Sequence, residues 1–228
     1  MSERRIVVAI DGPAGAGKST VAREVARALG YVLVDTGALY RGVALISKER
    51  GVAWTDGQAL GPLAESLALE LRPAADGSAR LFIDGRDRAD DIRTQEISMG
   101  ASDVSKHPEV RDALLGLQRH LGRNGGVVLE GRDIGTVVFP NAEAKIFLTA
   151  TPPARAGRRV TDLQSRGLPA ELETTLAEIQ ARDAQDQGRA VAPLRPADGA
   201  VIVDSTELDI DKVVARVVEV ARAAIARS

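Results

Sequence analysis

The chain has 228 residues, 44% of them hydrophobic, and its 30 lysines and arginines nearly balance 32 aspartates and glutamates, for a net charge of −2. This length suits one α/β domain with small insertions, and the near balance of charge argues against a nucleic-acid binder. The absence of cysteine excludes disulfides, thiolate chemistry and cysteine-ligated metals, and two histidines argue against a multi-histidine metal site. No segment approaches the roughly 18 apolar residues of a membrane span, so we expect a cytoplasmic protein without membrane contact.

The first predicted strand, Ile6–Ile10, leads through a glycine-rich turn into the predicted helix Thr20–Leu29. The turn, Gly12–Ser19, fits the G-x-x-x-x-G-K-[ST] pattern of a P-loop, whose backbone N–H groups bind phosphate at a helix N-terminus. Lys18 can reach the β- and γ-phosphates, and the Ser19 hydroxyl can coordinate Mg²⁺. A glycine-rich turn that binds no nucleotide is the weaker alternative. The predicted ATP-binding residues are Gly12, Pro13, Ala14, Gly15, Ala16, Gly17, Lys18, Ser19 and Thr20.

The second predicted strand, Tyr31–Val34, is followed by Asp35 or Thr36 as the cap of a helix that runs to about Arg50. In a doubly wound sheet the carboxyl ends of the strands face the ligand crevice. Arg41, one turn into this helix, can therefore reach an acceptor phosphate. The alternative is an ordinary helix cap followed by a solvated arginine.

Residues 62–101 break the alternation of strands and helices. Leu67–Arg72 and Ala79–Asp84 flank the dipeptide Asp76-Gly77, which is a hairpin signal. We therefore predict a small antiparallel insert over 62–101.

The next predicted strand, Val127–Glu130, runs into the polar segment Glu130–Thr136. Asp133 could accept a hydrogen bond from an exocyclic amine, and Arg132 could hold a phosphate at the same sheet edge. The alternative is a turn with a surface ion pair. A further strand is predicted at Lys145–Leu148.

Residues 152–190 are polar and rich in arginine, and they predict a mobile helical hairpin interrupted at Gly167 and Pro169. Arg182, Asp186 and Arg189 have the spacing of one helix face, which a salt-bridged solvent face would also explain. A strand at Val201–Val203 and a helix at Asp209–Arg227 are expected to complete the fold. The arginines of the first half of the hairpin are Arg155, Arg158, Arg159 and Arg166.

These elements predict an α/β fold, a doubly wound five-stranded parallel sheet with a P-loop. The expected organisation is a core of 1–61, 102–151 and 191–228, a monophosphate-binding insert over 62–101, and a helical lid with its following helix over 152–190. The chain lacks the Asn-Lys-x-Asp pattern of G proteins and the Leu-Ser-Gly-Gly signature of transporter ATPases. A small kinase that acts on a small acceptor is the favoured interpretation.

From about residue 5 to the C-terminus the chain resembles the bacterial cytidylate kinases, which belong to the nucleoside monophosphate kinases. Several of the matching stretches are particular to that family. They are Ile10–Ser19, Asp35–Arg41, Ile92–Glu96, Glu130–Pro140, Lys145–Leu148, Arg189–Leu194 and Asp204–Thr206. Two positions depart from the family pattern: Glu130 stands where aspartate is frequent, and Ala14 where some members have serine.

The resemblance implies a role for each matching residue. Cytosine is read by Ser102, Arg111 and Asp133; the ribose is held by Arg182 and Asp186; the CMP phosphate is held by Arg41, Arg132 and Arg189. Thr36 and Tyr40 complete the CMP site, and Arg158 is the lid arginine that closes on the transferring phosphoryl group. The implied catalytic residues are Lys18, Arg132, Arg158 and Arg189, with Ser19 as a direct Mg²⁺ ligand and Glu130 behind it.

The implied reaction is ATP + CMP → ADP + CDP, with dCMP as a further acceptor, Mg²⁺ as the cofactor and a monomeric enzyme that binds no nucleic acid. A phosphate monoester is mostly dianionic at neutral pH, so no general base is needed and alignment with charge neutralisation should suffice. Asp133 would meet an acceptor on uracil, so CMP should be preferred to UMP. The alternatives are a kinase for UMP or a small metabolite, a nucleotide-binding switch without turnover, and a nucleic-acid binder.

Overall fold

The computed structural model describes residues 5–75, 77–165 and 167–227. The hairpin residue Asp76 and the lid residue Arg166 lie outside these ranges. Within them, no helix combines the length and apolarity that crossing a membrane requires.

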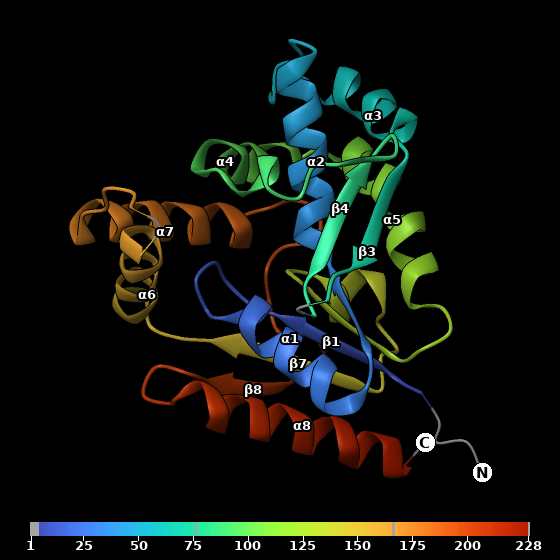
Figure 1. The fold of residues 1–228 in the computed structure, drawn as a ribbon, viewed down its shortest axis with the longest axis vertical. Helices are drawn as coiled ribbons and strands as arrows, with labels where there is room; N and C mark the ends of the chain where they lie inside the picture. The colour runs from blue at the N-terminus through green and yellow to red at the C-terminus, as the bar shows by residue number, and fades with distance from the viewer. Residues whose placement is uncertain (1–4, 76, 166, 228) are drawn as a thin grey trace.

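A five-stranded parallel sheet forms the centre of the fold, as the sequence predicted, with the order β2-β6-β1-β7-β8 (Figure 1). Strands β1 and β6 are buried at every residue, which is why they read as continuous apolar runs. The register places Asp35 beside Glu130 and Asp11 beside Gly131 at the carboxyl edge. The strands are β1 (Val7–Asp11), β2 (Val32–Asp35), β6 (Val127–Gly131), β7 (Ala144–Thr149) and β8 (Val201–Asp204).

Helices cover both faces of the sheet. On one face, α1 (Lys18–Leu29) and α8 (Ile210–Arg227) pack their apolar sides onto β1 and β7. On the other face, the π-helical turn η2 (Ile134–Val138) and α5 (Pro108–Gly122) cover β1 and β6. This doubly wound arrangement brings the carboxyl ends of β1, β2 and β6 to one edge.

The predicted hairpin is present, but it occupies only part of the predicted insert. Antiparallel strands β3 (Leu69–Pro73), β4 (Ala79–Ile83) and the short β5 (Arg86–Asp87) form a separate three-stranded sheet. They pack with α2 (Thr36–Glu49) in a second apolar core. The expectation of an antiparallel insert over 62–101 was too broad, because both ends of that range are helical.

The two helices at these ends were not predicted, although each carries an N-cap signal. α3 (Gly57–Ser66) begins after Asp56, whose side chain accepts from the Ala59 N–H at 3.0 Å. α4 (Gln95–Val104) follows the short 3₁₀ helix η1 (Asp91–Arg93) and begins after Thr94, which accepts from the Ile97 N–H at 3.2 Å. Pro62, Gly61 and Gly100 weaken the helical signal of the two sequences.

The arginine-rich hairpin forms α6 (Pro152–Ser165) and α7 (Leu172–Gln187), which pack against each other beside α4 (Figure 1). Helix α7 ends at Gln187, with Gly188 as its C-cap. Arg189 therefore lies in the following loop, and the expectation that it shares a helix face with Arg182 and Asp186 was wrong.

Candidate functional site

The P-loop connects β1 to α1 in a backbone conformation that only glycine adopts easily. Gly12 has a φ of 152°, and a Cβ atom there would lie 1.9 Å from the carbonyl oxygen of Leu148. Gly17, with a φ of 90°, is the N-cap of α1 and supplies no side-chain acceptor. The first N–H groups of α1 are thus left for an external anion.

Lys18 is the cation of this cradle. Its ammonium donates to the Pro13 carbonyl at 2.8 Å, and only 7% of the residue is exposed. Burial and then the nearby Arg132 guanidinium lower the pKa of Lys18 well below its usual range, against the opposing effect of Glu130. A polyanion beside Lys18 would relieve this repulsion and favour its protonated form.

Glu130 and Ser19 form an oxygen-rich pair at the end of β6. The Ser19 hydroxyl donates to Oε2 of Glu130 at 2.9 Å, whereas the buried Oε1 atom has no hydrogen-bond partner. Burial, and then the charge of Asp35, raise the pKa of Glu130 to about 7. An orphaned carboxylate oxygen beside a hydroxyl fits a hard divalent cation such as Mg²⁺.

The described residues contain no cluster of three or more histidine, cysteine or carboxylate side chains that could hold a metal. A cation at Ser19 and Glu130 would therefore keep water or phosphate oxygens as its other ligands. That is the usual coordination of Mg²⁺ in nucleotide sites.

Asp186 joins two arginines on the side of the site that faces Lys18 and the P-loop. It is fully buried and accepts from Arg132 at 2.9 Å and from Arg189 at 2.5 Å. Arg182 lies one helical turn before Asp186, and burial together with the Arg132 charge lowers its pKa to about 10. The buried Nε atoms of Arg182 and Arg189 have no partner. This excess of cations over Asp186 favours a phosphate in the space between them.

Arg41 lies at the start of α2, where it forms an ion pair of 2.6 Å with Asp35. Thr36 donates to the Glu130 carbonyl at 2.7 Å and ties the N-terminus of α2 to the end of β6. Both residues line the cavity.

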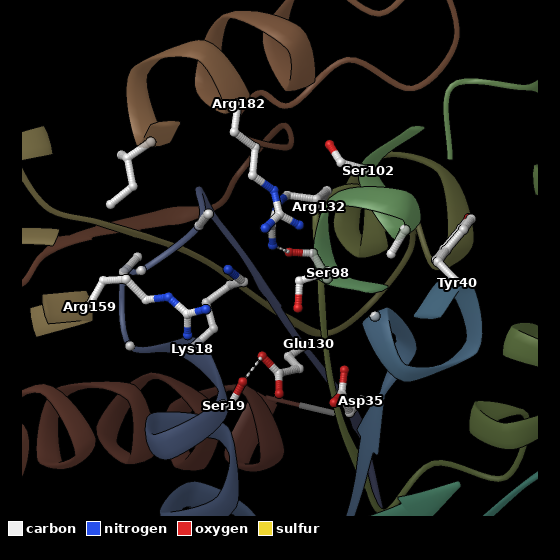
Figure 2. Close-up of a pocket in the computed structure, with 18 of the residues that line it drawn as sticks. Lys18, Ser19, Asp35, Tyr40, Ser98, Ser102, Glu130, Arg132, Arg159 and Arg182 are labelled. Carbon is white, nitrogen blue, oxygen red and sulfur yellow. Dashed lines mark hydrogen bonds between the residues drawn. The ribbon is translucent and has the colours of Figure 1, made fainter. Parts of the chain in front are cut away.

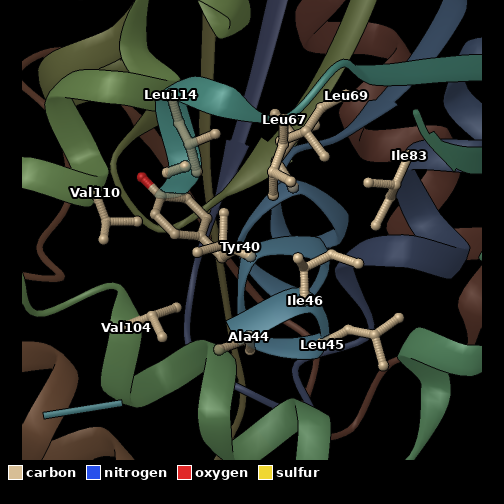
Figure 3. Packing of buried hydrophobic residues seen from close by; sticks show 14 of the residues in the cluster. Tyr40, Ala44, Leu45, Ile46, Leu67, Leu69, Ile83, Val104, Val110 and Leu114 are labelled. Carbon is tan, nitrogen blue, oxygen red and sulfur yellow. The ribbon is translucent and has the colours of Figure 1, made fainter. Parts of the chain in front are cut away.

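A buried ion pair between Arg111 and Asp133 forms another part of the cavity wall. The Arg111 guanidinium lies 5.7 Å from the ring centre of Tyr40, which is fixed in the apolar core around α2 (Figure 3). Ser102 on α4 accepts a hydrogen bond of 2.7 Å from Gln185 on α7. Acceptor, donor and aromatic groups thus converge there, as recognition of a planar base requires.

These two sides face one continuous cavity of about 940 Å³. Figure 2 shows Lys18, Glu130 and Arg182 directed into it. Of the predicted site residues, those that are not part of its wall are Gly12, Pro13 and Asp186. Gly12 lets the backbone pass close to Leu148, and the Pro13 carbonyl accepts from Lys18. Asp186 holds Arg132 and Arg189 in place.

The arginines of α6 differ from expectation in one respect. Arg158 lines the cavity, but its guanidinium donates to the hydroxyl of Ser205 at 3.0 Å and to its carbonyl. The adjacent Arg159 also lines the cavity and points toward its interior (Figure 2). Arg159 and Gln185 line the cavity without having been predicted to bind a ligand, and the arginine-rich composition of α6 was the available signal for Arg159.

A family model described as cytidylate kinase matches residues 8–223. The cytidylate kinase of Syntrophotalea carbinolica is 48% identical over 217 residues, which cover 95% of this chain and 92% of that protein. That of Exiguobacterium sibiricum is 48% identical over 222 residues, covering 97% and 99%. That of Geobacter sp. strain M21 is 49% identical over 212 residues, covering 92% and 90%. The residues matched by the family model include both the P-loop and the arginines around Asp186.

Proposed function

The chain belongs to the cytidylate kinase family, and we propose on that premise that it transfers the γ-phosphoryl group of ATP to CMP, giving ADP and CDP. The observation that carries this proposal is the arrangement of two anion-binding regions around one cavity. Lys18 and the N-terminus of α1 lie on one side, and the Arg132–Asp186–Arg189 cluster lies on the other. Two polyanions can therefore meet end to end.

The transfer needs positioning more than proton chemistry. An oxygen of the dianionic CMP phosphate attacks the γ-phosphorus of ATP, a new P–O bond forms, and the bond to the β-phosphate oxygen breaks as ADP leaves. Lys18 would bind the β- and γ-phosphates, while Arg41, Arg132 and Arg189 would orient the acceptor phosphate and offset the repulsion between the two anions.

Ser19 and Glu130 are the residues that would hold Mg²⁺ together with the donor. When bound there, the ion would offset part of the negative charge of the donor phosphates. The role of Glu130 in this proposal is to orient ligands of the ion through its free Oε1 atom. Residues 152–190 would act as the lid, with Arg158 and Arg159 beside the donor phosphates and water excluded on closure.

The base side supports CMP over UMP. The Asp133 carboxylate can accept from the N4 amine of cytosine, whereas uracil presents an acceptor at that position. Arg111 is paired with Asp133 and can donate to the ring acceptors O2 and N3. A buried carboxylate that faces an acceptor costs roughly 1–3 kcal/mol, so UMP should be the poorer substrate.

The ribose side supports dCMP as a second acceptor. Each carboxylate oxygen of Asp186 already accepts from an arginine. Loss of one ribose hydroxyl therefore leaves no buried carboxylate oxygen of Asp186 unpaired.

We propose a monomer that acts on CMP and dCMP and has neither nucleic acid nor a membrane as a partner.

The deciding experiment offers ATP and Mg²⁺ with CMP, dCMP, UMP, AMP or GMP in turn to the purified protein and separates the products by chromatography. We expect ADP and CDP in equal amounts and little turnover of UMP. Lys18→Ala should lose CDP formation, while its circular dichroism spectrum should show that the fold is retained. Equal rates with UMP and CMP would contradict the assignment of the base site. ATP hydrolysis that no acceptor stimulates would favour a nucleotide switch.

A further inference from the structure

Asp11 is a buried carboxylate that connects the P-loop strand to the loop that carries Asp133. It is the last residue of β1, directly before Gly12, and only 3% of it is exposed. Its Oδ1 atom accepts from the Ile134 N–H at 2.8 Å, and its Oδ2 atom accepts from the Gly135 N–H at 2.7 Å. These are N–H groups of the first residues of η2, which begins directly after Asp133.

The strand register adds a second connection between the same two segments. Asp11 is the Cα partner of Gly131 in the pairing of β1 with β6. The main chain is thus held to Asp11 at Gly131 and again at Ile134 and Gly135. Arg132 and Asp133 are the two residues between these fixed points.

A neutral polar side chain would not hold this loop in the same way. A carboxylate has two oxygens that accept at once, and each N–H group of η2 uses one of them. Burial, with a further contribution from the Asp133 charge, raises the pKa of Asp11 to about 6, and the two backbone N–H groups oppose that rise. In its ionised form the carboxylate keeps both acceptors.

We propose that Asp11 is a positioning residue for acceptor-base selectivity, which it exerts by fixing the backbone on both sides of Asp133. This inference rests on the proposed function, because it assigns the reading of cytosine to Asp133. Asp11 is absent from the cavity wall, so it does not contact the base itself and acts on it through the loop that carries Asp133. A shift of that backbone would move the carboxylate relative to the N4 amine and reduce discrimination between cytosine and uracil.

The test is Asp11→Asn, which keeps the shape of the side chain but replaces one acceptor oxygen by a donor. The readout is the ratio of kcat/KM for CMP to kcat/KM for UMP. We expect this ratio to fall at least about 10-fold, while KM for ATP at saturating CMP changes less than about 2-fold. An inactive or unfolded fraction cancels from the ratio, because it lowers both rates equally.

A matched control is Asp56→Asn, which alters another aspartate that accepts a backbone N–H, at the start of α3. Its CMP:UMP ratio should stay at the unmodified value. If Asp11→Asn lowers thermal stability and both rates but leaves the ratio unchanged, Asp11 has only a structural role and the proposal is overturned.

A double variant tests the route of the effect. In an Asp133→Asn background, Asp11→Asn should change the selectivity ratio no further, because its effect passes through Asp133. Additive effects of the two substitutions would refute that route. If the unmodified protein used neither CMP nor UMP, the proposed function would fail, and calorimetric binding of the two nucleotides to the same variants would still decide the role of Asp11.

Discussion

Ser19 donates a hydrogen bond of 2.9 Å to one oxygen of Glu130, and the other oxygen of that carboxylate is buried without a partner. Such an arrangement costs free energy in the protein alone, because a buried polar atom has lost water and gained nothing. It becomes favourable when a cation or its bound water occupies the free oxygen. Glu130 is therefore expected to serve function at the expense of stability.

We predict that Glu130→Gln stabilises the protein while it lowers activity. The folded-state pKa of Glu130 is raised from 4.5 to about 7, so the folded protein binds a proton that the unfolded chain has released. This carboxyl group favours folding below the lower value and loses that contribution as pH rises toward 7. The difference is on the order of 3 kcal/mol by pH 8.

The measurement is Tm against pH for Glu130→Gln and the unmodified protein. The gain in Tm should be small at pH 4.5 and reach several degrees at pH 8. The exposed carboxylate of Glu96 on α4 supplies the control Glu96→Gln, whose Tm should show no such gain. A pH-independent gain, or none, would contradict the account of Glu130.

The same residue predicts a dependence on metal. Addition of a chelator should abolish transfer, and Mg²⁺ should restore it, because Ser19 and Glu130 offer too few ligands to retain the ion alone. In Glu130→Gln we expect the Mg²⁺ concentration for half-maximal rate to rise about 10-fold. This concentration is measured by titrating the initial rate against free Mg²⁺ at constant ATP. An unchanged midpoint would show that Glu130 does not contribute to Mg²⁺ binding.

Asp133→Asn should weaken the preference for CMP over UMP. The asparagine side chain can turn its amide toward the uracil oxygen, so the selectivity ratio should fall by about 10-fold or more, the equivalent of roughly 1–3 kcal/mol. The substitution also leaves the buried Arg111 guanidinium without its charge partner, so Tm should fall. Kinetics with each nucleotide at several concentrations measure the ratio. A variant that lost activity with both nucleotides in equal proportion would argue that Asp133 does not read the base.

The regular core was accessible from the sequence because its signals are local. The strands β1 and β6 are short β-branched runs buried along their whole length, and the P-loop pattern stands between β1 and α1 where phosphate binding requires it. The antiparallel hairpin was predicted from the dipeptide Asp76-Gly77 between its two strands. By contrast, α3 and α4 contain glycine or proline, and only their caps marked them.

The site was predicted as a set of residues but not as a set of contacts. The pairing of Asp11 with Ile134 joins residues 123 positions apart, and that of Arg155 with Asp183 spans 28. No local pattern encodes such pairs, because they depend on the order of the strands in the sheet and on how α6 packs against α7. Arg158 donates a hydrogen bond to Ser205, which turns its guanidinium toward the loop after β8. This contact could not be predicted from the sequence for the same reason.

Arg155 joins the P-loop to the helical pair α6 and α7, and its loss should affect the binding of both substrates. Only 3% of it is exposed, and it donates to the Ala14 carbonyl at 3.0 Å, to the Ala150 carbonyl at 2.9 Å and to both oxygens of Asp183. Arg155→Met would leave the Asp183 carboxylate and the carbonyls without this donor. We expect a loss of about 3 kcal/mol or more in the free energy of unfolding.

The measurement is urea unfolding, with KM for ATP and for CMP determined on the folded fraction. Both KM values should rise, because Asp183 lies directly beside Arg182 on α7 while Ala14 belongs to the P-loop. Arg155→Met combined with Asp183→Leu removes the unpaired charge and should recover much of the stability. If the double variant were no more stable than Arg155→Met alone, the ion pair would not be the source of the loss.

Two glycines should respond in opposite directions to replacement by alanine. At Gly12 a Cβ would lie 1.9 Å from the Leu148 carbonyl, and the φ of 152° is strained for any other residue. At Gly116, inside α5, an added Cβ would meet no heavy atom within 4 Å other than its chain neighbours and the backbone of its own helix. Gly12→Ala should therefore disrupt the join between β1 and the P-loop and abolish ATP binding. Gly116→Ala should stabilise the protein by roughly 0.5–1 kcal/mol through helix propensity. Thermal unfolding and calorimetric ATP titration measure both effects, and retention of ATP affinity by Gly12→Ala would show that the loop can rearrange around a side chain.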